Sequence, residues 1–185
     1  SVVRTTQNKF YRQGVSSGDE LANGLPTTAK ELFAYDALII GSYEAPALTP
    51  VQHELIKDFV DRRGGSVLML AGRSGLADGG WGGAAIAQAL PVHLPAKRSN
   101  DFVQAPVKAV LTSYGLDSTA LRFDADRERN IEQWQGLPNL ANYQRLGNLK
   151  PGAVVLLEAQ VKDRREPLLV WQRYGRGSVY VLATA

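Results

Sequence analysis

The 185-residue sequence contains no cysteine, and this absence excludes several kinds of chemistry at once. Disulfide bonds, thiolate metal ligands and every mechanism with a cysteine nucleophile require the missing thiol. Histidine is scarce as well, because only His53 and His93 supply imidazole groups. No spacing of His, Asp and Glu is typical of a metal site, so no metal ion is expected.

Long apolar runs and a strong charge are also missing. No run approaches the roughly 20 residues of a membrane-spanning helix, so direct membrane insertion of this segment is not expected. Lys plus Arg exceed Asp plus Glu by 21 to 18, and a net charge of +3 gives no reason to expect a nucleic-acid partner. With 44% hydrophobic and 21% charged residues, the composition is that of an ordinary globular domain.

The clearest local pattern is a strand, a helix and a second strand in succession. Residues 37–41 and 67–72 are apolar runs that end in glycine, which is typical of strands buried on both faces. Between them, Thr49 fits a helix N-cap, Gln52 completes a capping box, and Gly64 ends the helix. This order predicts two parallel strands joined by a right-handed crossover.

The remaining pattern predicts one mixed α/β domain over residues 1–185. A strand opens the chain at residues 1–5, which suggests a piece of a longer protein, and a polar stretch over 6–30 is interpreted as a long loop. We expect a mostly parallel sheet with an antiparallel C-terminal hairpin. Further elements are predicted as follows: helices over 84–90 and 126–134, and strands over 107–112, 120–123, 153–159, 168–174 and 178–183.

The glycine-rich loop over residues 72–83 is the first candidate ligand site, because open α/β sheets bind ligands at the carboxyl ends of their strands. Arg73 in this loop could pair with a phosphate or a carboxylate, although a surface arginine is the simpler interpretation. Ser74 matches no complete nucleophile motif and would need His93 as a base within hydrogen-bond reach. The loop matches neither a dinucleotide fingerprint nor a P-loop, so no cofactor is expected, and no catalytic residue is assigned.

Three more residues are candidates for ligand binding at the same sheet edge. Glu44 follows the first apolar strand and could form a polar site with Asp78, whereas a surface salt bridge is the alternative for Glu44. Trp81 is flanked by glycine pairs, so periodicity assigns it to no core, and it could cover a pocket or a partner surface.

Four segments carry a resemblance to a known family: residues 35–41 (YDALIIG), 48–52 (LTPVQ), 64–70 (GGSVLML) and 171–180 (WQRYGRGSVY). Together they resemble class I glutamine amidotransferase-like domains. The most similar branches are the trehalose-utilisation-like proteins and the amidotransferase-like domains of large bacterial membrane proteins, where a von Willebrand factor A domain commonly accompanies them. The resemblance implies a flavodoxin-like three-layer sandwich.

The resemblance also implies where an active site would lie. Active members of the family place a cysteine at the turn after the strand that matches residues 67–71, with a downstream His and Glu. Here that turn reads Ala71-Gly72-Arg73-Ser74, and no histidine follows His93. Glutamine hydrolysis through a thioester is therefore excluded. The chain also begins where the family would already have completed one strand and one helix.

Three hypotheses for function follow. The first is a non-catalytic amidotransferase-like domain that serves ligand binding or protein assembly in a larger, membrane-anchored protein, with neighbouring domains such as a von Willebrand factor A domain as partners. The second is a hydrolase or sugar-modifying enzyme of the trehalose-utilisation-like type that uses Glu44 and Asp78 as acid and base. The third is an interaction module whose exposed Trp81 loop binds a neighbouring domain.

Overall fold

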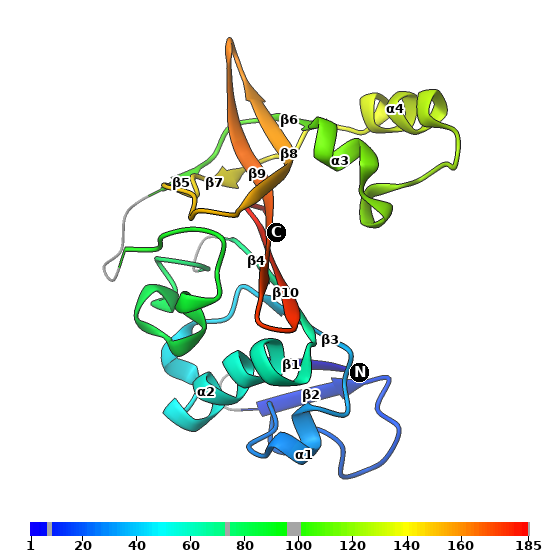
Figure 1. Cartoon of the computed structure of the whole chain (residues 1–185). Helices are drawn as coiled ribbons and strands as arrows, with labels where there is room; N and C mark the ends of the chain where they lie inside the picture. Colours follow the sequence, from blue (N-terminus) through cyan, green and yellow to red (C-terminus); the bar gives the residue numbers. More distant parts are fainter. Residues whose placement is uncertain (7–8, 73–74, 96–100, 185) are drawn as a thin grey trace.

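The computed structural model describes residues 1–6, 9–72, 75–95 and 101–184. Its centre is a six-stranded sheet in the order β3-β4-β10-β9-β8-β6 (Figure 1). β3 pairs with β4 and β4 with β10 in parallel, and the other three pairings are antiparallel. The strands are β3 (Ala37–Gly41), β4 (Ser66–Leu70), β6 (Lys108–Leu111), β8 (Val154–Val161), β9 (Arg164–Tyr174) and β10 (Gly177–Leu182).

The α/β class is confirmed, but the flavodoxin-like three-layer sandwich with a mostly parallel sheet is wrong. Most pairings in the sheet are antiparallel, and the described residues form only four α-helices, none longer than 10 residues. The reason lies in the connections, because tight turns follow both β8 and β9 and short turns join only antiparallel strands. The helical crossover between β3 and β4 makes one parallel pair, and the other, between β4 and β10, joins strands that are distant in sequence.

The predicted strand, helix and strand unit is confirmed closely. Helix α2 (Pro50–Asp58) begins with the capping box of Thr49 and Gln52. It continues as a π-helical turn, η2 (Phe59–Arg63), and ends at Gly64, whose φ of +85° is readily available to glycine.

Shorter elements surround the sheet, and three predictions for them are wrong. Residues 6–30 contain the strand β2 rather than a loop alone, residues 120–123 form no strand, and residues 84–90 contain a 3₁₀ turn. The antiparallel strands at the C-terminus are confirmed. The further elements are β1 (Val2–Thr6) paired with β2 (Lys9–Gln13), β5 (Phe102–Val103) paired with β7 (Tyr143–Gln144), α1 (Ala29–Leu32), α3 (Ser113–Asp117), α4 (Arg127–Gly136), and the 3₁₀ turns η1 (Ala45–Ala47), η3 (Trp81–Gly83), η4 (Ala85–Gln88) and η5 (Thr119–Leu121).

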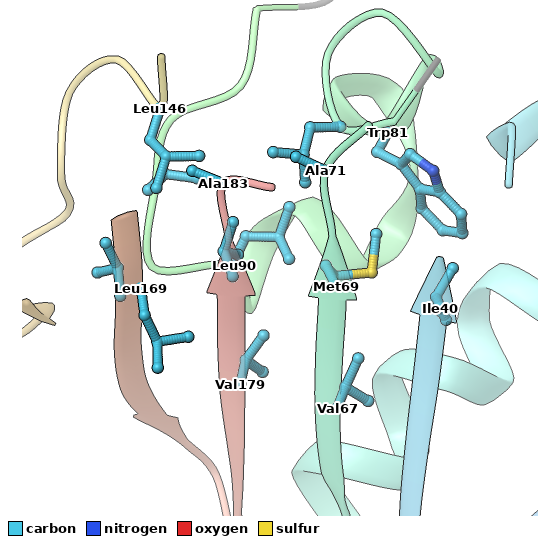
Figure 2. Close-up of a cluster of buried hydrophobic side chains, with 14 of the residues drawn as sticks. Ile40, Val67, Met69, Ala71, Trp81, Leu90, Leu146, Leu169, Val179 and Ala183 are labelled. Carbon is cyan, nitrogen blue, oxygen red and sulfur yellow. The ribbon is translucent and has the colours of Figure 1, made fainter. Parts of the chain in front are cut away.

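The core lies against the middle strands of the sheet (Figure 2). Alternate residues of β4 and β10 are buried there, together with side chains from the loops that follow β4. Burial of β3 on both faces is wrong, because β3 is the end strand and Ile39 is 64% exposed. Core residues in the figure include Ile40, Val67, Met69, Ala71, Trp81, Leu90, Leu146, Leu169, Val179 and Ala183.

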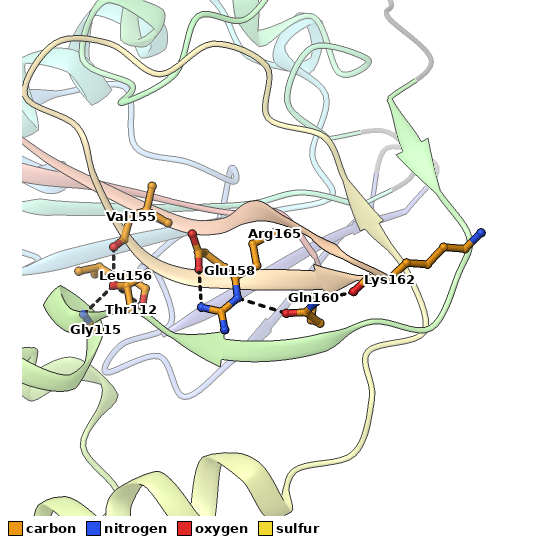
Figure 3. A network of polar contacts seen from close by, with 8 residues as sticks. All are labelled: Thr112, Gly115, Val155, Leu156, Glu158, Gln160, Lys162 and Arg165. Carbon is orange, nitrogen blue, oxygen red and sulfur yellow. Dashed lines mark hydrogen bonds and ion pairs between the residues drawn. The ribbon is translucent and has the colours of Figure 1, made fainter.

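The turn between β8 and β9 is solvent-exposed, as the mixed charges of residues 162–166 predict. Arg165 from β9 reaches Glu158 at 3.4 Å and Gln160 at 3.2 Å on β8 (Figure 3). Exposed pairs of this kind contribute about 0–1 kcal/mol, so they hold the hairpin register and create no binding site. Within the described ranges, no helix is long and apolar enough to cross a membrane.

Candidate functional site

A cavity of about 560 Å³ lies beyond the carboxyl ends of the parallel strands β3 and β4. The loop after β3 contributes Ala45 and Pro46, the loop after β4 contributes Gly80 and Ala84, and α2 contributes His53. The carboxyl ends of neighbouring parallel strands are where an α/β sheet brings two loops together and forms a crevice. The strand order therefore explains the position of the cavity.

Two hydrogen bonds join the loops that form this cavity. The backbone N–H of Ala45 donates to the carbonyl oxygen of Gly79 at 2.7 Å. The indole Nε1 of Trp81 donates to the carbonyl oxygen of Tyr43, also at 2.7 Å, and the Trp81 side chain is fully buried. A buried indole N–H normally requires such a partner. Together, these two hydrogen bonds fix the spacing between the loop after β3 and the loop after β4.

His53 is the polar side chain that distinguishes the cavity. Its Nε2 lies 2.9 Å from the carbonyl oxygen of Ala45, and its ring meets the Trp81 ring edge-on at 5.7 Å between centroids. Because a carbonyl only accepts, Nε2 carries the proton and Nδ1 of the neutral ring is an acceptor. Nδ1 is buried and has no hydrogen-bond partner among the described residues.

Charge at the cavity is neutralised locally. Glu54, on the rim, forms an ion pair with Lys57 at 2.8 Å, and the hydrogen bond from this pair raises the pKa of Lys57. Glu54 is the one lining residue of the cavity with a charged side chain in the described structure. The other described lining residues are uncharged, with the polar side chains of His53 and Gln88 set among glycine, alanine and proline, which suits a small neutral ligand better than an ion.

The start of α2 is positioned by its own cap. Thr49 Oγ1 accepts from the backbone N–H of Gln52 at 3.3 Å, and Gln52 Oε1 accepts from the backbone N–H of Thr49 at 3.0 Å. Gln52 Nε2 also donates to the carbonyl of Leu25 at 2.7 Å. These bonds fix the first turn of the helix and so place His53 beside the two loops.

Of the predicted site residues, the three that the structure describes, Glu44, Asp78 and Trp81, do not line this cavity. Glu44 is exposed and Asp78 is half-buried, and neither lines the cavity, although each directly precedes one of the two residues joined by the Ala45–Gly79 hydrogen bond. Trp81 is fully buried, so its interpretation as an exposed binding residue is wrong. The sequence does not identify Trp81 as a core residue, because the glycines on either side of it remove the periodicity by which core positions are recognised.

Arg73 and Ser74 lie outside the described residues. The position of His53 on its helix predicts that it faces solvent or the helix flank, and it instead lines the cavity. One partner, Ala45, lies eight residues before His53, but the other, Trp81, comes from the loop after β4, and no local signal in the sequence marks this contact. His93, considered as a base for Ser74, is exposed.

No family model matches this sequence, and no curated protein matches it either. Solved structures do share its fold, a mixed α/β domain. One is the cytoplasmic protein STM3548 from Salmonella typhimurium, with 20% identity and a TM-score of 0.67 over 87% of this chain. Another is the cytoplasmic protein STM1381 from Salmonella typhimurium LT2, with 25% identity and a TM-score of 0.64 over 86% of this chain.

The chain is shorter than both of these proteins, since it covers 65% of the first and 64% of the second. A segment of the cold-adapted β-galactosidase from Rahnella sp. R3 is also similar, with 16% identity and a TM-score of 0.50 over 83% of this chain and 21% of the enzyme. This likeness concerns the fold alone and assigns no sugar chemistry to the present chain.

Proposed function

We propose that this chain is a non-catalytic, glutamine amidotransferase-like domain whose cavity binds a small neutral molecule that carries hydroxyl or amide groups. The observation that carries the proposal is His53, which lines a cavity at the carboxyl ends of β3 and β4 and whose Nδ1 is buried without a partner among the described residues. A buried acceptor without a donor costs about 1–3 kcal/mol. Because Nδ1 is buried, a ligand in the cavity reaches it only when the His53 ring turns toward the ligand, and a ligand N–H or O–H that then donates to Nδ1 would remove this penalty.

The absence of cysteine supports a binding role over glutaminase chemistry. A thioester mechanism needs a thiolate at the turn after β4, and the sequence has no cysteine there or anywhere else. The resemblance of the strand, helix and strand unit to amidotransferase-like domains supports the family assignment, although the rest of the sheet departs from the flavodoxin-like fold of that family. It extends the proposal to a larger bacterial membrane protein, in which a von Willebrand factor A domain is the neighbouring partner.

The structure gives less support to a hydrolase that uses Glu44 and Asp78. A general acid in glycoside hydrolysis is normally held in a buried pocket beside the substrate. Glu44 is exposed, and neither carboxylate lines the cavity. We therefore propose ligand binding without catalysis as the function of this chain.

The two histidines make a direct test of ligand binding possible. In a ¹⁵N-labelled protein, each histidine gives its own imidazole signals, and His93, which is exposed, serves as an internal control. Glutamine, for its side-chain amide, and glucose, for its hydroxyls, are the two probes. We expect at least one of them to shift the Nδ1 resonance of His53 while the signals of His93 stay in place.

The same samples test catalysis. We expect no ammonia release from glutamine above that of a buffer blank. Release that disappears in a His53→Ala variant would overturn the non-catalytic assignment. If neither probe moves the His53 signal, or if both histidines shift equally, the ligand-binding assignment fails.

A further inference from the structure

The outer edge of β3 is open. β3 is an end strand of the central sheet, and in the part of the chain that the structure describes its outer row of backbone N–H and C=O groups has no strand partner. Ala37, Ile39 and Gly41 are exposed on one face of the strand, and Ile39 is 64% exposed. An apolar edge of this kind is a template for a further strand.

A slot of about 490 Å³ runs along this edge. The hairpin β1–β2 supplies Val2, Val3 and Phe10 to one side, and β3 supplies Ile39 and Ile40 to the other. None of the described residues that line the slot has a charged side chain. A charged occupant would lose its hydration there without a partner, so the slot suits an uncharged one.

Exposed apolar side chains gather around the slot. Eight large hydrophobic side chains are exposed among the described residues, and four of them belong to β3 or to the hairpin β1–β2. These four are Val2, Phe10, Tyr11 and Ile39, and all of them except Tyr11 line the slot. Clusters of this kind mark interaction sites more often than single exposed residues do.

The hairpin β1–β2 has no third strand among the described residues. β1 pairs only with β2 within the described ranges, and every residue of β2 is exposed. A two-stranded hairpin is marginally stable in water, and a third strand with an apolar face is usually needed. A strand placed beside β3 would also contact Val2 and Val3 of β1, and would thus connect the hairpin to the central sheet.

We propose that this slot binds one extended, uncharged β-strand of a partner polypeptide, which pairs with the outer edge of β3 and covers Ile39. Main-chain hydrogen bonds to the edge supply affinity, and the apolar walls select the side chains. β3 has five residues, so the bound segment is about 16 Å long. A second copy of this chain is the alternative occupant, and the edge of its sheet would have to enter a slot that the hairpin β1–β2 also lines.

A synthetic peptide with blocked termini tests the proposal on the unmodified chain. The probe has alternating valine and threonine residues with one lysine at each end, and its control carries N-methyl groups on alternate residues, which remove the donors that a strand edge requires. We expect the unmodified peptide to bind in isothermal titration calorimetry, and the methylated peptide to bind about tenfold more weakly or not at all.

Two matched variants locate the binding surface. Ile39→Lys places a charge in the slot, whereas Val51→Lys changes a side chain on α2 that is exposed to a similar extent, 61% against 64%. We expect Ile39→Lys to weaken peptide binding about tenfold and Val51→Lys to leave it unchanged.

Equal binding of the two peptides, or no binding of either, would overturn the proposal. A dimer in sedimentation that Ile39→Lys dissociates would assign the edge to a second copy instead. If Ile39→Lys fails to fold, the comparison of the two peptides on the unmodified chain still tests whether a strand pairs with the edge of β3.

Discussion

The indole nitrogen of Trp81 donates a hydrogen bond to the carbonyl oxygen of Tyr43 at 2.7 Å, and so ties the loop after β4 to the loop after β3. The Trp81 ring is fully buried and meets His53 edge-on. Trp81 thus supports the cavity from behind, where it holds the His53 ring against the carbonyl of Ala45. Its contribution is structural, and it is measurable as stability.

Trp81→Phe is expected to reduce the free energy of unfolding by about 1–3 kcal/mol, because it leaves the Tyr43 carbonyl without its donor. Trp171→Phe is the matched control, since Trp171 Nε1 is buried and has no partner in the described structure. Removing an unpaired buried donor relieves a cost that offsets part of the packing lost with the smaller ring, so Trp171→Phe is expected to reduce the stability less than Trp81→Phe. Urea unfolding of both variants measures the difference, and an equal loss in the two would contradict the role assigned to Trp81.

Thr49→Ala removes the cap of α2 and is expected to lower the stability by about 1 kcal/mol. Thr49→Ser keeps a hydroxyl oxygen that can accept from the backbone N–H of Gln52, so most of the stability should return. Thermal unfolding of the two variants checks this. Because the cap also positions His53, Thr49→Ala should broaden the imidazole signals of His53 more than those of His93.

Local signals in the sequence predict local structure well. The capping residues Thr49 and Gln52 and the terminating Gly64 define one helix, and the structure confirms all three. The order of the strands in the sheet is not predictable in this way, because the sequence of a buried apolar strand does not indicate which strands lie beside it. β10 lies between β4 and β9, so one parallel and one antiparallel partner flank a strand whose sequence shows only that it is buried.

The site is harder to predict for the same reason. His53 and Ala45 lie eight residues apart in the connection between β3 and β4, and the parallel pairing of these strands brings Trp81 beside them. The position of the cavity at the carboxyl ends of the strands follows from general rules, which is why the sequence points to the correct loops. The identity of its polar group does not follow, because it depends on side-chain contacts across the fold.

Gly115→Ala is expected to destabilise the protein by about 1–3 kcal/mol through overpacking. A Cβ at Gly115 would overlap the carbonyl oxygen of Leu156, where α3 packs against β8, and would lie 3.1 Å from Leu111 Cδ2 (Figure 3 shows Gly115 beside Leu156). Thr112 holds this contact, since its Oγ1 accepts from the backbone N–H of Gly115 at 3.0 Å and donates to the carbonyl of Val155 at 2.7 Å.

Gly136→Ala is the control for this substitution. Gly136 is the last residue of α4, and a Cβ there meets nothing within 4 Å. Alanine is expected to stabilise this position by about 0.4–1 kcal/mol, because it restricts the unfolded chain. Chemical denaturation should therefore give shifts of opposite sign for the two variants, and a loss of stability in both would refute the packing argument.

Glu20 gathers hydrogen bonds from three residues near the hairpin β1–β2. The hydroxyl of Ser1, the backbone N–H and hydroxyl of Ser16 and the hydroxyl of Tyr35 all donate to its carboxylate. These bonds, with that of Ser1 the largest, lower the pKa of Glu20 from its ordinary value of 4.5 to about 2. Burial and then the bond to Glu20 raise the pKa of Tyr35 to about 12.

The lowered pKa of Glu20 predicts the direction of a pH effect. Because the folded state binds the Glu20 proton more weakly than the unfolded state, Glu20 contributes its full stability above a pH of about 4.5, and this contribution is lost as the pH falls through about 2. The difference in melting temperature between the unmodified chain and Glu20→Gln should therefore shrink over that range. The carboxyl carbon of Glu20 should titrate in NMR with a midpoint near 2, and in Glu20→Gln the Tyr35 phenol should ionise below 12. A carboxyl midpoint at the ordinary 4.5 would show that the serine and tyrosine hydroxyls do not hold Glu20 in solution.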